Sequence, residues 1–327
     1  MVMKTIQNVL AFLLGTLLVF LIWASITANA EGKNNTIKIA IMPTFGAHQH
    51  IGYEVIDRMK AQGINVETVI IKSSTQGNGL LMNEQIDVNV GAITSFILLD
   101  NKKPGEGKLL SAVSHYKFFL LCTPDIKNMQ DVLTTNIVTS GRNTTEHHTI
   151  RWLAKKHFND AYALEKNFIT MSRPQIYQIM KAGSKDIKCV MTGAPLQNQL
   201  QDELGLKVIE QSDVDNGIAG SYNVYWTRTD FAKANPKIIE AFVKTTVGVI
   251  DEYNQDPTKI LNSFITKDKL KFTKSYLLKS YKKNKSVFHY DLRGAEYFND
   301  FLHEIGYIKG DKTDLNQATF DLNLIQK

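Results

Sequence analysis

Cysteine is scarce in this chain. Two cysteines among 327 residues exclude a disulfide-built scaffold and a four-cysteine zinc site. The 7 prolines and 20 glycines exclude collagen-like and low-complexity chains. Neither sign of charge dominates, because 38 basic and 32 acidic side chains leave a net charge of only +6, which does not indicate nucleic-acid binding. Apolar residues make up 43% of the chain, which is enough to build a core.

Motifs typical of enzymes are also missing. The sequence contains no G-x-S-x-G, no Walker loop, no C-x-x-C and no G-x-G-x-x-G. We therefore expect a binding protein with no catalytic residues, no cofactor and no resident metal.

The first 30 residues carry one charged side chain, Lys4, and an apolar run from Val9 to Trp23. The run is followed by Ala28-Asn29-Ala30, a small-x-small pattern that predicts a cleaved secretory signal peptide at 1–30. An uncleaved anchor is the alternative. No later apolar stretch approaches 18 residues, so we expect no further membrane span. Because of the signal peptide, we expect the mature chain to work outside the cytosol, in an oxidising space.

Short β-rich runs alternate with helical patterns in the first part of the mature chain. We expect strands at Thr36–Ile41, Val66–Ile71 and Asp87–Gly91, a helix from Ile51 to Gly63, and a polar loop at Ser73–Gly79. This alternation is typical of βαβ units around a parallel sheet.

The same alternation then restarts, which predicts a second α/β lobe. The further strands are expected at His115–Cys122, Asn136–Ser140, Leu164–Thr170 and Ile187–Met191. Helices are expected at 149–158, at 174–181 and, with Pro at its start, at about 236–254.

Four segments in this order resemble the periplasmic substrate-binding proteins of ABC importers. They are IKIAIMPTFGAHQHIGYEVIDRMKAQGINVETVII, MNEQIDVNVGAITSFIL, PQIYQIMKAGSKDIKCVMTGAPLQ and FAKANPKIIEAFVKTTVGVIDEYNQDP. The nearest branch is the nitrate/sulfonate/taurine and thiamine-pyrimidine-precursor (type II) branch, and the likeness runs from about Ile37 to Asp256. The family's Gly before the strand at Asn136 is missing, and so is its Asp-Ala after the third strand of the second lobe.

The resemblance implies an α/β, two-lobed periplasmic binding protein type II fold with a ligand trapped between the lobes by hinge closure. Lobe one would comprise 31–117 plus 227–327, and lobe two 118–226, with crossovers at His115–Cys122 and Gly220–Thr227. It also implies a periplasmic monomer that captures a small anionic or polar organic solute and delivers it to an ABC permease in the inner membrane. Two alternatives stay open: a secreted relative of pyrimidine-synthase-type enzymes, and a ligand-sensing module for a membrane partner.

Ligands of open parallel sheets bind at the carboxyl ends of the strands, where helix N-termini attract anions. The loops there are rich in hydroxyls, amides and glycine, and Arg142 adds a guanidinium suited to a carboxylate, sulfonate or phosphate. We expect ligand contacts from Thr44, Phe45, Gln76, Thr94, Ser95, Ser140, Arg142, Asn143, Thr144, Thr192 and Tyr222.

Four histidines, His48, His50, His147 and His148, lie in loops expected to face the same cleft. They could contact a ligand or a transition metal, although no metal motif such as H-E-x-x-H is present.

The two cysteines fall in strands of lobe two that are neighbours in binding proteins of this topology. Cys122 and Cys189 could form a disulfide across these strands or remain packed thiols, because strand register decides between the two and cannot be read from the sequence.

Overall fold

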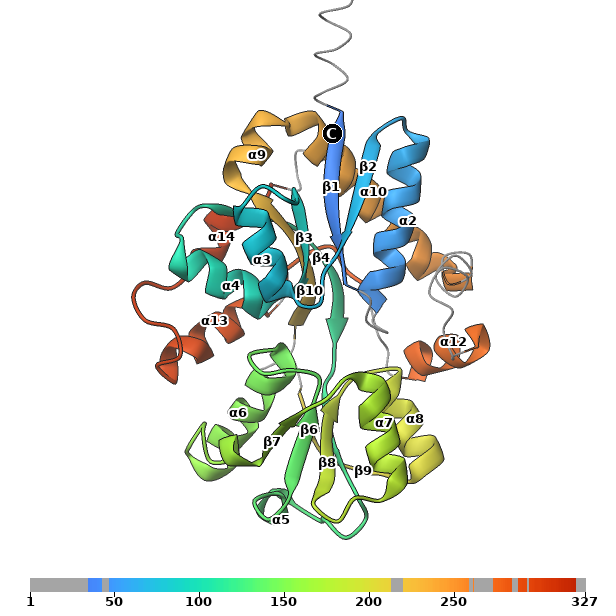
Figure 1. The fold of residues 1–327 in the computed structure, drawn as a ribbon, viewed down its shortest axis with the longest axis vertical. Helices are drawn as coiled ribbons and strands as arrows, with labels where there is room; N and C mark the ends of the chain where they lie inside the picture. The colour runs from blue at the N-terminus through green and yellow to red at the C-terminus, as the bar shows by residue number, and fades with distance from the viewer. Residues whose placement is uncertain are drawn as a thin grey trace, which may run out of the picture.

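The computed structural model describes residues 35–42, 47–212, 220–258, 261, 273–283, 288–292 and 294–321. These ranges form two lobes, each built on a five-stranded sheet (Figure 1). None of their helices combines the length and the apolar character that a membrane span requires. The predicted signal peptide at 1–30, and Thr44 and Phe45 of the predicted site, lie outside the described residues.

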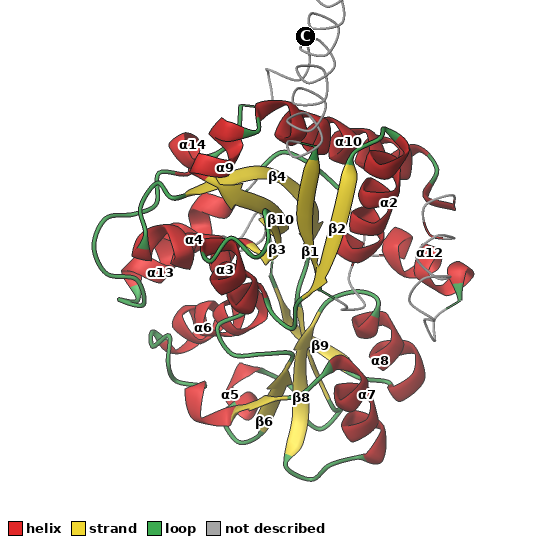
Figure 2. Ribbon diagram, turned by 45° about the horizontal axis from the view of Figure 1, so that its top comes forward, coloured by secondary structure: helices red, strands yellow, loops and turns green. Residues whose placement is uncertain are grey.

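The sheet of lobe one has the strand order β2-β1-β3-β10-β4. Its strands are β1 (Thr36–Ile41), β2 (Asn65–Ile70), β3 (Val88–Ala92), β4 (Gly107–Tyr116) and β10 (Gly220–Arg228). β1 pairs in parallel with β2 and β3, and β10 lies antiparallel between β3 and β4. Apolar side chains of α2 (Ala47–Ala61) and α10 (Pro236–Gln255) cover one face, and those of α3 (Ser74–Met82) and α4 (Ile93–Lys102) cover the other (Figure 2).

The sheet of lobe two has the strand order β7-β6-β8-β5-β9. Its strands are β5 (Phe119–Cys122), β6 (Asn136–Thr139), β7 (Phe168–Thr170), β8 (Ile187–Thr192) and β9 (Lys207–Gln211). The helices of this lobe are α5 (Met129–Val132), α6 (Thr145–Phe158), the 3-10 turn η1 (Glu165–Asn167), α7 (Arg173–Ala182) and α8 (Leu196–Leu204). The buried apolar side chains of α6 pack on one face of the sheet, and those of α7 and α8 pack on the other.

The C-terminal helices follow β10. They are α9 (Thr229–Ala234), α10, α12 (Lys274–Lys283), α13 (Ala295–Glu304) and α14 (Leu315–Ala318). The buried side chains of α13 join those of α4 and β10, so α13 belongs to lobe one.

The chain crosses between the lobes twice. It leaves β4 after Tyr116 and enters β5 at Phe119, so the single strand predicted at His115–Cys122 is two strands in different sheets. It returns after β9 and forms β10 in the first sheet from Gly220 onward, earlier than the boundary predicted at Thr227. The crossings are tied together, because Phe118 N donates to Ser212 Oγ at 2.8 Å and Ser212 N donates to Phe118 O at 2.8 Å.

The polar loop predicted at Ser73–Gly79 is wrong, because helix α3 begins at Ser74. The side chain of Ser73 caps this helix by accepting a hydrogen bond from Gln76 N at 3.1 Å. Gly77, interpreted as a loop residue in the sequence, lets the helix approach the sheet, because a Cβ there would lie 2.1 Å from Asn89 Oδ1. Close packing therefore overrides the low helix propensity of glycine.

Cys122 and Cys189 form a disulfide. They lie directly opposite each other in the antiparallel pair of β5 and β8, and both are fully buried. The register thus selects the bridged alternative of the two that the sequence left open.

Candidate functional site

Two helix N-termini, one from each lobe, meet at the lobe interface. α4 begins at Ile93 directly after β3, and α6 begins at Thr145 shortly after β6. Thr94 Oγ1 lies 3.3 Å from Thr145 Oγ1, and both side chains are fully buried. The first-turn N–H groups of a helix have no intrahelical acceptor, and the helix dipole adds positive potential there. The two lobes therefore bring hydroxyl groups and positive helix ends to one place.

A buried polar network fixes the α4 end on lobe one. Ser95 Oγ lies 2.7 Å from Ser74 Oγ, and Asn78 Nδ2 donates to Ser95 O at 2.9 Å. Asn89 Nδ2 donates to Ser74 O at 3.1 Å, and Trp226 Nε1 donates to Asn78 Oδ1 at 3.0 Å. The sequence prediction missed Ser74, Asn78 and Asn89; the signal that points to them is a lone Asn inside the apolar strand Val88–Ala92. The network holds the α3 and α4 ends rigidly together.

The loop before α6 is shaped by its capping residues. Thr144 caps the helix: its Oγ1 accepts from His147 N at 3.3 Å and donates to Gly141 O at 2.9 Å. Asn143 adopts a left-handed conformation with φ +60°, which Asn tolerates better than most residues. Its backbone N donates to Nδ1 of His147 at 2.9 Å. These bonds set the direction in which α6 leaves β6.

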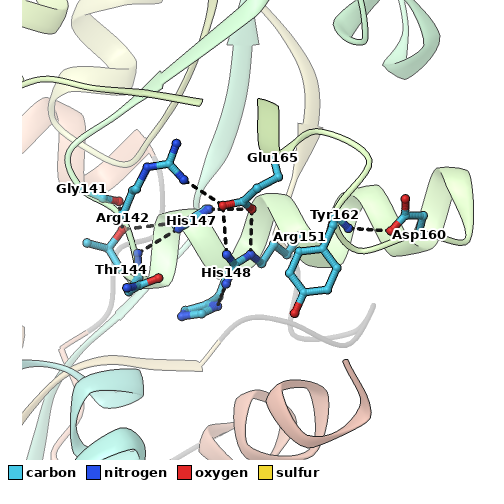
Figure 3. Close-up of polar contacts among 10 residues, drawn as sticks. Gly141, Arg142, Thr144, His147, His148, Arg151, Asp160, Tyr162 and Glu165 are labelled. Atoms are coloured by element: carbon cyan, nitrogen blue, oxygen red, sulfur yellow. Dashed lines mark hydrogen bonds and ion pairs between the residues drawn. The ribbon is translucent and has the colours of Figure 1, made fainter. Parts of the chain in front are cut away.

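The guanidinium of Arg142 is paired with Glu165 (Figure 3). Arg142 Nη1 lies 2.8 Å from Glu165 Oε1, and its side chain is 52% exposed. The same carboxylate accepts from Arg151 Nε and Nη2, each at 3.1 Å, and from His147 Nε2 at 3.2 Å. Burial alone would raise the pKa of the Glu165 carboxyl, but Arg151 and His147 hold it below its usual range. Glu165 lies 23 residues after Arg142, so no local spacing indicates this pair.

A second carboxylate, Glu146, is buried in the first turn of α6. Its Oε1 accepts from Ser140 Oγ at 3.1 Å and from Arg173 Nη2 at 3.3 Å, and the residue is 1% exposed. Arg173 is the first residue of α7, which follows β7, so its guanidinium group lies near the carboxyl end of β7 in lobe two. The sequence prediction named Ser140 but missed both charged partners.

The remaining predicted residues are placed as follows. Gln76 is exposed, and its Oε1 accepts from Lys72 N at 2.7 Å within the α3 capping loop. Thr192 is 2% exposed at the end of β8. Tyr222 lies in β10, and its side chain is outside the described residues.

His147 and His148 are buried on α6. Because Nδ1 of His147 accepts from Asn143 N, its proton resides on Nε2, which donates to Glu165. Burial, and next the charge of Arg151, lower the pKa of His147 to about 4. Burial also lowers the pKa of His148 well below its usual value. The described residues contain no group of three or more potential ligands that could hold a metal, and the His48 and His50 side chains lie outside them.

Because of these two buried histidines, we expect the folded protein to lose stability as the pH falls from 6.5 to 4. In this window the unfolded imidazoles take up protons while the folded ones stay neutral, so stability falls as the pH falls. We expect the slope of unfolding free energy against pH, measured by urea titration at several pH values, to flatten in the double variant His147→Gln/His148→Gln. An unchanged slope would contradict the assignment.

No protein-family model matches the chain, and no curated protein matches it. Solved structures do. The conserved Candida albicans protein said to define a new family with the generic periplasmic binding protein fold has a TM-score of 0.65 at 16% identity, over 87% of this chain and 96% of that one.

The chain has the periplasmic binding protein fold.

Two further neighbours with this fold carry names that include a ligand class. The periplasmic aliphatic sulphonate binding protein of Escherichia coli has a TM-score of 0.64 at 13% identity, covering 90% of this chain and 99% of that one. The alkanesulfonate-binding protein of Xanthomonas axonopodis, solved with bound MOPS, has a TM-score of 0.64 at 10% identity, covering 88% and 98%. Within this periplasmic binding protein fold, Thr94 and Thr145 meet between the two lobes, just beyond the carboxyl ends of the parallel strands β3 and β6.

Proposed function

We propose that this protein is the extracytoplasmic solute-binding component of an ABC importer. One observation carries the proposal: the N-termini of α4 and α6, one from each lobe, converge until Thr94 Oγ1 and Thr145 Oγ1 are 3.3 Å apart. A solute held at this point touches both lobes. It therefore favours the closed arrangement over an open one by its extra contacts.

The solute class that fits these ends is a small anion or a polar organic molecule with an anionic head group. Helix N-termini and hydroxyl groups donate hydrogen bonds to oxyanions. The names of the sulfonate-binding neighbours support a sulfonate as the first candidate. Thr94, Ser95, Thr144 and Thr192 lie at the element ends that would surround it. Arg142 would contact an anion only by exchanging its ion pair with Glu165.

Hinge motion would occur at the two crossings. The hydrogen bonds between Phe118, in the first crossing, and Ser212, directly after β9, would keep these two residues side by side as the lobes rotate. The lobes would close by rotation about this pair, with little change inside either sheet.

The place and partners follow from this function. Export through the 1–30 segment would deliver the protein to the periplasm, and the Cys122–Cys189 disulfide fits an oxidising compartment. The partner would be an ABC permease, which receives the solute without chemical change, so the protein would act as a binder and not as an enzyme.

The test is a thermal-shift screen of the mature protein with ethanesulfonate, MOPS, nitrate and pyrimidines, followed by calorimetry. A bound solute at 100 times its Kd stabilises the folded protein by about 2.7 kcal/mol. Failure of every solute to shift the melting temperature would contradict the proposal.

For the solute that binds, Thr145→Val is expected to weaken affinity about tenfold, because one hydrogen bond to an anion is lost. Thr229→Val is the matched control. Its Oγ1 donates to Gly105 O at 2.7 Å, next to the end of β10 that is remote from the crossing. If the two variants bind the solute with equal affinity, Thr145 does not contact it.

A further inference from the structure

Helix α6 of lobe two contacts lobe one through the segment that follows α13. In Figure 3 the side chain of His148 points away from that of Arg142, on the other side of α6. Tyr307 lies against this side: its ring centroid is 4.8 Å from that of His148, edge to face, and 4.8 Å from the Arg151 guanidinium carbon. Arg151 also stacks on Tyr162, at 5.1 Å.

Further contacts join the same two segments. Tyr162 Oη donates to Ile305 O at 3.2 Å, and Lys155 Nζ lies 3.6 Å from Glu304 Oε1. Trp152 and Ala161 of lobe two pack into the apolar cluster of lobe one that contains Phe298. The ion pair is exposed and contributes little, whereas the ring of Tyr307 contacts both His148 and Arg151 of α6.

A second contact lies on the other side of the molecule, between α12 and α8 (Figures 1 and 2). Ser280 Oγ donates to Asn198 Oδ1 at 2.6 Å, with both residues buried, and Lys283 Nζ lies 3.3 Å from Asp202 Oδ1. The chain after α12 is fixed to α10, because Asn254 Nδ2 donates to Phe288 O at 2.8 Å. Lobe one thus contacts lobe two through two C-terminal arms, which are α12 and the segment Glu304–Tyr307 at the end of α13.

We propose that these two arms form an intramolecular latch that holds the lobes closed in the absence of solute, with Tyr307 as its main contact. The latch goes beyond the proposed function, since it requires no particular solute. Neither contact forms within a single lobe, so separating the lobes by rotation at the crossings breaks both. α6 carries Thr145 at one end and the Tyr307 contact along its side, so the closed position of its N-terminus is set by the latch before a solute arrives.

The test measures lobe separation without solute. Spin labels attached at Lys102→Cys on α4 and Lys185→Cys after α7, both exposed positions, report the distance between the lobes by double electron–electron resonance. Tyr307→Ala is expected to raise the ratio of open to closed molecules about tenfold, because a cation–π and an aromatic contact are lost. Tyr307→Phe retains the ring and is expected to keep the wild-type distances.

Wild-type distances in Tyr307→Ala would overturn the latch. If that variant does not fold by circular dichroism, Ser280→Ala at the second contact decides: longer distances support the latch, and unchanged distances overturn it. A solute screen that fails while Tyr307→Ala opens would reject the importer function and leave the latch standing.

Discussion

Replacing Cys122 and Cys189 together by alanine is expected to lower the free energy of unfolding by about 4 kcal/mol. The disulfide closes a loop with a sequence separation of 67, and the unfolded chain without it gains the corresponding entropy. The bridge also joins two strands at the centre of the lobe-two sheet, where both cysteines are fully buried. Urea unfolding of the mature protein, followed by circular dichroism, measures the loss.

Reduced wild-type protein is the control for packing, since it keeps both sulfur atoms but not the bond. It is expected to lose nearly as much stability as the double variant. If oxidised and reduced wild-type proteins unfold at the same urea concentration, the stabilisation assigned to the bond is wrong.

Gly77→Ala is expected to destabilise the protein by about 3 kcal/mol, by overpacking and by disrupting a buried polar network. The new Cβ would lie within 2.1 Å of Asn89 Oδ1 and 2.6 Å of its Nδ2. Asn89 is fully buried, accepts from Val90 N at 2.9 Å and donates to Asn78 Oδ1 at 3.1 Å, so it cannot move without losing these bonds. Thermal and urea unfolding measure the change.

Gly79→Ala, two residues along the same helix, is the matched control. Nothing lies within 4 Å of a Cβ built at Gly79, so alanine is expected to stabilise the protein by about 0.5–1 kcal/mol through helix propensity. Effects of opposite sign are therefore predicted for the same chemical change at two positions of one helix. Equal effects would show that the contact with Asn89 is not what restricts position 77.

Local patterns were sufficient for most elements of the fold. The strand expected at Thr36–Ile41 matches β1 residue for residue, and the helix expected at about 236–254 matches α10 within one residue. α3 was predicted only as a short helix at Leu80–Gln85, which overlaps its last turn, and β9 was missed; the reasons differ. Gly77 of α3 is required by its close approach to a partner distant in the sequence, Asn89. β9 at Lys207–Gln211 is a half-exposed edge strand with little hydrophobic pattern.

The candidate site was only partly predictable for the same reason. Thr94 lies in the first turn of α4 directly after β3, and Thr144 caps α6, and the strand-to-helix pattern of the sequence is sufficient to place both residues at helix starts. That Thr94 would meet Thr145, and that Arg142 would pair with Glu165, depends on how segments far apart in the chain pack. Such pairings follow from tertiary structure, and no spacing in the sequence encodes them.

The position of β10 bears on the order in which the protein folds. Lobe two is continuous along the chain from β5 to β9, so all its strands are present before β10 is made. The sheet of lobe one is not continuous along the chain. β3 and β4 are joined only through β10, which begins more than 100 residues after the end of β4. Until then, β4 and one edge of β3 have unpaired backbone groups, the kind of edge that promotes aggregation. A chain extended from its N-terminus therefore completes the sheet of its second lobe before that of its first.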